Sequence, residues 1–170
     1  MDLAQDDDRA LFTGILQKST RIVVTTHINP DPDAIASAFG MLTLVRHLVR
    51  RPAIIVQSGT IGRAENRSLI EACRIRLTDI RNADVSARDT VVLVDAQHPN
   101  SNYPFGKKIT PRIVIDHHPV RAKTYAAAYH DIRPHCGSTS TIIHEYLSAF
   151  DVPVSKLMAS ALFYGIKTDT

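Results

Sequence analysis

Three short runs of aliphatic and β-branched residues each end where aspartate or histidine begins. The runs are residues 21–25, 90–94 and 112–115. His27 follows the first run, Asp95 the second, and Asp116, His117 and His118 the third. Such runs are typical of buried strands, and the carboxyl ends of strands in an open parallel sheet form the edge at which ligands bind. The chain is therefore predicted to present imidazole and carboxylate groups at one edge of a sheet.

Helical patterns alternate with the strands along the chain. Pro52 marks the end of the helix that follows the first motif, and Ser155 is the expected cap of the last helix. The predicted helices cover residues 8–19, 33–51, 64–73, 138–150 and 155–166, and further strands or extended pieces cover 53–57, 75–77 and 124–129. This alternation implies parallel strands with crossover helices. We expect an α/β fold with a mostly parallel sheet flanked by helices on both faces.

Composition restricts the class of protein. A chain of 170 residues corresponds to about one domain, and its net charge of +3 gives no strong nucleic-acid footprint. The longest apolar runs are far shorter than a membrane span, and the acidic N-terminus has none of the features of a signal peptide. Cys73 and Cys136 form no CxxC pair, which favours a reducing compartment. We expect a cytoplasmic protein without a membrane partner.

Two aspartates follow the first strand, at Asp31 and Asp33, shortly after His27. Pro30 and Pro32 exclude a helix interior there, and carboxylates two residues apart in an extended loop point in different directions. They can therefore serve two adjacent metal ions. Capping of the next helix is an alternative explanation for Asp33, but not for the whole set. Imidazole and carboxylates together suit hard or borderline divalent metals.

Taken in order, these motifs resemble the DHH phosphoesterase family, including its RecJ-like and nano-RNase-like members. The resemblance extends from about residue 21 to residue 170. It rests on His27-x-x-x-Asp31-x-Asp33, the strand-end Asp95, Asp116-His117-His118, and Gly165-Ile166-Lys167-Thr168-Asp169-Thr170. It implies that residues 1–170 form the catalytic domain. Family enzymes usually continue into a second, substrate-binding domain with a Gly-Gly-Gly-His-like segment, and we expect that domain to be absent from this chain.

The resemblance also implies a site for two divalent ions. One ion would be held by His27, Asp31 and Asp95, and the other by Asp33, Asp95, His117 and Asp169. Asp95 would bridge the two ions and offset their mutual repulsion. Mixed oxygen and imidazole ligation favours manganese, with magnesium as the alternative, over structural zinc. The predicted catalytic pair is His118, facing the substrate phosphate, and Asp116, orienting an imidazole.

Substrate contacts are less constrained by the sequence. Ser138 and Thr139 open a helix in a Gly-Ser-Thr turn, where backbone N–H groups can hold a phosphate, although helix capping alone explains them as well. Arg63 is a second predicted contact, to a nucleotide, and a solvated helix face explains it equally well. Pro32 stands where many family members have glycine, which leaves the substrate class open.

The resulting hypothesis is a manganese-dependent phosphoesterase. It would hydrolyse phosphate ester bonds of short single-stranded oligonucleotides or small nucleotide phosphates through a water activated by two metal ions. A pyrophosphatase-like phosphohydrolase is the nearest alternative, and a regulatory metal- or nucleotide-binding module without turnover is the alternative from another class. The sequence leaves homodimer formation open.

Overall fold

The computed structural model describes residues 6–120 and 127–170. The helices are α1 (Asp6–Gln17), α2 (Pro32–Leu48), α3 (Ala64–Cys73), α4 (Thr139–Ala149), α5 (Lys156–Asp169) and the 3-10 helix η1 (Ile80–Asn82). The strands are β1 (Ile22–Thr25), β2 (Ala53–Gln57), β3 (Leu77–Asp79), β4 (Thr90–Val94), β5 (Ile113–Asp116) and β6 (Tyr129–Ile132). The predicted strand at 124–129 falls largely outside the described residues, and the observed strand begins at its last position.

The strands form one six-stranded sheet in the order β3-β2-β1-β4-β5-β6, and every neighbouring pair is parallel. The predicted α/β fold with a parallel sheet is confirmed. The chain leaves β1 toward one edge and then returns to β4 to build the other half. The order therefore reverses between β1 and β4, and in open α/β sheets the crevice outside the strand ends at such a point is where ligands bind.

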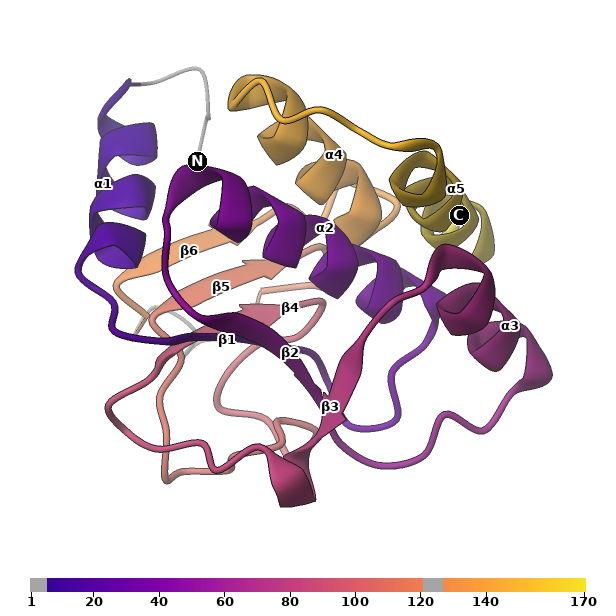
Figure 1. Ribbon diagram of the computed structural model, residues 1–170, viewed down its shortest axis with the longest axis horizontal. Coiled ribbons are helices and arrows are strands. Elements are labelled where there is room, and N and C mark those ends of the chain that lie inside the picture. Colours follow the sequence, from indigo (N-terminus) through magenta and orange to yellow (C-terminus); the bar gives the residue numbers. More distant parts are fainter. Residues whose placement is uncertain (1–5, 121–126) are drawn as a thin grey trace.

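The two faces of the sheet are covered differently (Figure 1). Successive side chains of a strand point to opposite faces. Val24 and Val92 face the larger core, to which all five α-helices contribute. Val23 and Val91 face the other side, where residues of η1 and of connecting loops, among them Phe105, complete the cover. The α-helices thus cover one face of the sheet, as expected. On the other face, the described residues that cover the sheet belong to loops and to η1.

The loop between β4 and β5 explains this difference. Pro99, Pro104 and Gly106 interrupt the segment, and proline and glycine disfavour a helix interior. Tyr103 nevertheless has only 2% of its surface exposed, because it packs against strand residues Leu93 and Val114. An irregular loop with a buried aromatic side chain therefore replaces a crossover helix on this face.

Helix α2 packs closely against α4 and α5 at Gly40. A Cβ at this position would lie 2.5 Å from Cγ2 of Ile143 and 3.5 Å from Cδ2 of Leu162. Gly40→Ala should lower the free energy of unfolding by about 1–3 kcal/mol, because the added methyl overpacks the interface. Gly14→Ala in α1 is the control, since a Cβ there meets no atom within 4 Å. It should raise stability by up to about 1 kcal/mol through helix propensity. Urea unfolding measures both variants, and equal effects would contradict this packing argument.

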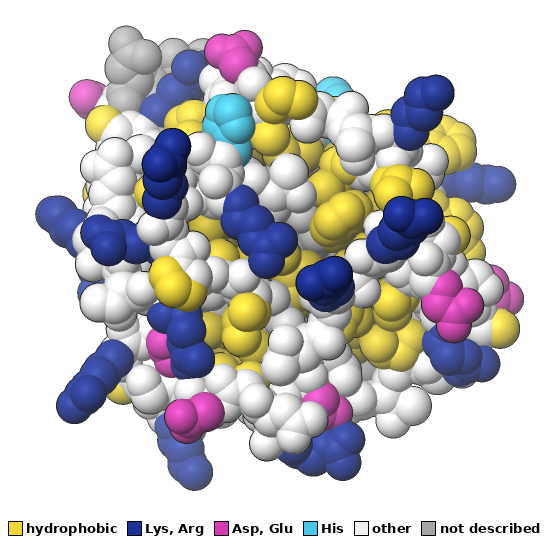
Figure 2. All heavy atoms as spheres, viewed as in Figure 1, with side chains coloured by type: hydrophobic (Ala, Val, Ile, Leu, Met, Phe, Trp, Pro, Cys, Tyr) yellow, Lys and Arg dark blue, Asp and Glu magenta, His cyan; other side chains and the backbone are white. Residues whose placement is uncertain are grey.

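One face of the surface is shown in Figure 2. Lys and Arg side chains are spread across it with hydrophobic side chains between them, and Asp and Glu lie mainly toward its margin. The cations of this face form no continuous stripe. Within residues 6–120 and 127–170, no helix is both long and apolar enough to cross a bilayer.

Candidate metal centre

The segment from the end of β1 to the first turn of α2 carries three of the predicted ligands, at the point where the strand order reverses. Asn29 adopts a left-handed conformation with φ of 58°, and the chain then turns into α2. Asp31 is the N-cap of this helix, and its Oδ1 accepts a hydrogen bond from the amide of Ala34 at 2.9 Å. Pro32 occupies the first turn, where its missing N–H costs nothing. The capping role considered for Asp33 thus belongs to Asp31, and the Asp33 carboxylate is used elsewhere.

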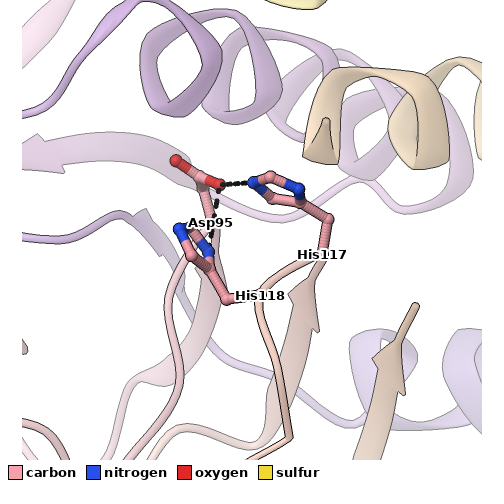
Figure 3. Close-up of side chains that lie close together, drawn as sticks. All are labelled: Asp95, His117 and His118. Atoms are coloured by element: carbon pink, nitrogen blue, oxygen red, sulfur yellow. Dashed lines mark ion pairs between the residues drawn. The ribbon is translucent and has the colours of Figure 1, made fainter. Parts of the chain in front are cut away.

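Asp95 lies at the centre of the predicted metal ligands. Only 2% of its surface is exposed, and its φ of 58° lies in the left-handed region, which aspartate tolerates better than most residues. Its Oδ2 is 3.5 Å from Nε2 of His27, and its Oδ1 is 3.6 Å from Nε2 of His117 and 3.9 Å from Nδ1 of His118. Figure 3 shows the rings of His117 and His118 converging on one oxygen of Asp95. Its two oxygens therefore face opposite halves of the site.

Two imidazoles are oriented by backbone carbonyls. Nδ1 of His27 lies 2.9 Å from the carbonyl oxygen of Ile28, and Nδ1 of His117 lies 3.3 Å from that of Cys136. A carbonyl oxygen can only accept a hydrogen bond, so each Nδ1 carries a proton, and Nε2 is the ring nitrogen that can bind a metal ion. This is how metal-binding histidines are usually oriented.

The ligand atoms gather into three overlapping groups, and within each group they lie within 4.8 Å of one another. The groups are His27, Asp31 and Asp95; Asp33, His117 and Asp169; and Asp95, His117 and His118. Nε2 of His117 is buried without a hydrogen-bond partner among the described residues and lies 3.0 Å from Oδ2 of Asp169. A buried nitrogen lone pair facing carboxylates fits a divalent cation. The first two groups contain all six residues predicted as metal ligands.

The electrostatics of the cluster also fit a cation. Burial raises the pKa of Asp95 to about 6, against the contact with His27, and the negative charges of Asp33 and Asp31 add to the increase. Burial lowers the pKa of His27, but contacts with Asp31 and Asp95 outweigh it and raise that pKa to about 10. Burial, followed by the charge of Asp33, raises the pKa of Asp169. A divalent ion among these carboxylates would offset their repulsion.

Asp116 and His118 form a hydrogen-bonded pair next to Asp95. Oδ1 of Asp116 lies 2.9 Å from Nδ1 of His118, and this contact is the main cause that raises the pKa of His118 to about 9. Asp116 is fully buried, whereas 54% of the His118 side chain is exposed. The carboxylate therefore fixes the ring, and Nε2 remains available to a ligand.

The N-terminus of α4 donates hydrogen bonds to two of the carboxylates. The amides of Thr139 and Ser140 donate to the two oxygens of Asp33 at 2.7 and 2.8 Å, and Oγ1 of Thr139 donates to Oδ1 of Asp95 at 2.8 Å. Ser138 caps the same helix, through Oγ accepting from the amide of Thr141 at 3.2 Å. Ser138 and Thr139 are fully buried. Their groups are engaged with the helix and the carboxylates, so a positioning role fits them better than the predicted phosphate contact.

A family model described as "DHH family, N-terminal domain" matches residues 21–166. The chain belongs to the DHH family. It is 36% identical over 154 residues to an uncharacterized protein of Methanocaldococcus jannaschii, covering 91% of this chain and 31% of that protein. It is also 30% identical over 156 residues to a Streptococcus suis protein named "Probable manganese-dependent inorganic pyrophosphatase", covering 89% of this chain and 49% of that one. The chain thus spans half or less of the length of these relatives.

A solved structure has the same fold as this DHH chain. It is an exopolyphosphatase-related protein from Bacteroides fragilis, with a TM-score of 0.69 and 19% sequence identity. The match covers 98% of this chain and 51% of the other. At this identity the likeness concerns the fold alone.

Two cavities adjoin the candidate metal centre of the DHH chain. The first, of about 280 Å³, is lined by His27, Asp95, Asp116, His118, Asn100 and Asn102. The second, of about 600 Å³, lies between Asp31 and Asp169 and contains Arg63 in its wall. The structure thus brings the predicted ligands, the predicted catalytic pair and Arg63 to one region.

Gln97 is a further residue of the site that the sequence motifs did not predict. Its side chain is 2% exposed, and Nε2 donates to Oδ2 of Asp116 at 2.7 Å and to the carbonyl oxygens of His118 and Pro119 at 3.1 and 3.2 Å. Gln97 therefore fixes the strand-end loop that carries the two histidines. Its place two residues after Asp95 was the available signal, since it follows the same strand end.

Removal of the Thr139 hydroxyl should weaken metal binding in this DHH chain. Thr139→Val preserves the shape of the side chain and the hydrogen bond from the backbone N–H to Asp33, but it removes the hydroxyl that donates to Oδ1 of Asp95. Loss of such a supporting hydrogen bond typically costs about 10–100-fold in metal affinity. Calorimetric titration with Mn²⁺ measures this. Thr139→Ser should restore affinity, and Thr141→Val, which removes a hydroxyl that hydrogen bonds to Ser138, should leave it unchanged. Wild-type affinity in Thr139→Val would rule out this role.

Proposed function

We propose that this DHH chain hydrolyses phosphate ester bonds of short single-stranded oligonucleotides or small nucleotide phosphates, with two Mn²⁺ ions as cofactors and Mg²⁺ as the alternative. One observation carries the proposal: two ligand groups lie on either side of the buried Asp95, next to the Asp116–His118 pair. Two ions bound in that arrangement would hold a phosphate beside a side chain that can donate a proton.

The residues of the site would perform two tasks, which are metal binding and proton transfer. His27 and Asp31 would hold one ion and Asp33, His117 and Asp169 the other, with Asp95 shared. Ions bound there would lower the pKa of a coordinated water and polarise the phosphoryl oxygens.

His118 performs the second task. Asp116 holds its Nδ1–H at 2.9 Å, and His118 lines the first cavity, so its Nε2 would be free to hydrogen bond to a phosphoryl oxygen there or give its proton to the leaving oxygen. Gln97 and Asp116 keep that ring in place while the ligand enters.

A second candidate function is hydrolysis of pyrophosphate. It is favoured by the Streptococcus suis relative, whose name specifies a manganese-dependent inorganic pyrophosphatase. The same ligand groups would serve either substrate, because both reactions transfer a phosphoryl group to water. A regulatory module without turnover is less well supported, since every ligand position of both groups is filled by a residue able to bind metal.

Rates on three substrates separate these functions. The chain is treated with EDTA, reloaded with Mn²⁺ or Mg²⁺, and assayed with bis-p-nitrophenyl phosphate, a dinucleotide and pyrophosphate. The proposal expects Mn²⁺-dependent cleavage of both esters. Cleavage of pyrophosphate alone would favour the second candidate. Two bound ions without turnover of any substrate would favour the regulatory module.

A further inference from the structure

The second cavity is large enough for a small organic ligand and is larger than the first. Its volume is about 600 Å³, against about 280 Å³ for the first cavity beside His118. Sites for small organic ligands typically measure roughly 300–1,000 Å³. The cavity begins at Asp31 and Asp169, which belong to different ligand groups, so it opens toward both proposed ion positions.

The wall of the second cavity has the chemistry of a nucleoside site. Tyr164 of α5 offers a half-buried aromatic ring, and aromatic rings bind nucleobases by stacking. Arg63 lies at the N-terminus of α3, and its exposed side chain makes no ion pair with any other described residue. Asn66 and Thr168 add neutral polar groups.

The same wall is poorly suited to a second phosphate. Arg63 is the single cation in it, whereas Glu65 adds a carboxylate that belongs to neither ligand group. A phosphate chain would need several cations to offset its charge, and Glu65 would repel it. A carboxylate instead accepts hydrogen bonds from ribose hydroxyls or from the amino groups of a base.

Hydrogen bonds fix the position of the cavity wall relative to the candidate metal centre. Nδ2 of Asn66 donates to the carbonyl oxygen of Pro30 at 3.2 Å, next to Asp31. Arg67 donates to the carbonyl oxygens of Ile61 and Gly62 at 3.1 and 2.8 Å, which fixes the loop before Arg63. A ligand in the cavity would therefore meet a wall already placed relative to the ions, and it would lose little affinity to ordering of this segment.

We propose that the second cavity binds the nucleoside part of a nucleotide whose phosphate lies at the metal centre. Tyr164 stacks on the base and Arg63 and Glu65 contact its polar groups. This inference rests on the proposed function, because it requires phosphate to bind at the ions. It selects nucleotide esters over pyrophosphate as the substrate class.

Calorimetric titration of the Mn²⁺-loaded chain with AMP, inorganic phosphate and pyrophosphate tests the subsite. AMP should bind about tenfold or more tightly than phosphate, the size expected for stacking of one base. Tyr164→Ala should remove most of that advantage and leave the affinity for phosphate unaltered, and Tyr164→Phe should retain it. Arg63→Ala should weaken AMP several-fold, whereas Arg50→Ala, an exposed arginine beyond the far end of α2, should change nothing.

The outcomes separate the subsite from the proposed function. Phosphate binding with no advantage for AMP overturns the subsite alone. A loss of pyrophosphate affinity equal to that of AMP in Arg63→Ala overturns it too, because the occupant is then a second phosphate. Failure of all three ligands to bind the Mn²⁺-loaded chain overturns the proposed function and the subsite together. Circular dichroism checks the fold of Tyr164→Ala, and Arg63→Ala tests the subsite at an exposed position should that fold be lost.

Discussion

Replacing Asp95 with alanine should abolish binding of the Mn²⁺ pair. The two oxygens of Asp95 face histidines of different ligand groups, at 3.5 Å from His27 and 3.6 Å from His117. Two divalent ions about 3.5–4 Å apart repel each other, and a shared carboxylate offsets that repulsion. Removing it should therefore cost both sites. Calorimetry and metal analysis after dialysis should find fewer than one ion per chain.

The left-handed backbone at Asp95 needs its own control. Alanine at φ of 58° is strained by about 1–2 kcal/mol, and this cost is independent of any role of the Asp95 carboxylate in metal binding. Asp151 is exposed and has φ of 52°, so Asp151→Ala carries a similar backbone cost outside the site. Asp95→Asn is the complementary variant, because asparagine tolerates this conformation and removes only the charge. Two intact Mn²⁺ sites in Asp95→Asn would contradict the bridging role.

Local sequence patterns predicted the strands that carry the site. Strands such as Ile113–Asp116 are short, rich in β-branched residues and buried, and the site residues stand at or directly after their ends, so strand and motif are predicted from neighbouring positions. The family resemblance supplied the order of motifs, and the structure brings them together at the edge where the strand order reverses. This agreement concerns placement, while the roles of the ligands stay predictions.

Contacts between distant segments could not be predicted in the same way. Asp33 accepts hydrogen bonds from the amides of Thr139 and Ser140, more than a hundred positions away. Nothing near Asp33 in the sequence distinguishes that partnership from capping of its own helix, which Asp31 performs. The loop containing Tyr103 likewise has no regular spacing of hydrophobic residues that would indicate a helix or a strand, so its burial against the sheet depends on the tertiary fold.

Alanine at His118 should lower turnover while leaving metal content nearly unchanged. Proton transfer by a positioned side chain contributes about 10²–10⁴-fold to rate, and His118→Ala should lose an amount in that range. The structure favours this role because the His118 nitrogen that faces Asp95, Nδ1, is already bonded to Asp116 at 2.9 Å. His144, an exposed histidine on α4, gives the matched control, and His144→Ala should change neither quantity.

His117 should behave differently from its neighbour, and the contrast is the decisive measurement. Its Nε2 is buried without a hydrogen-bond partner among the described residues, and it is 3.0 Å from Asp169. His117→Ala should therefore lower metal content and turnover together. Asp95, His117 and His118 are nevertheless close enough to form a ligand group of their own. Equal loss of Mn²⁺ from His117→Ala and His118→Ala would make both histidines ligands, and proton donation to the leaving oxygen would then need another residue of the first cavity.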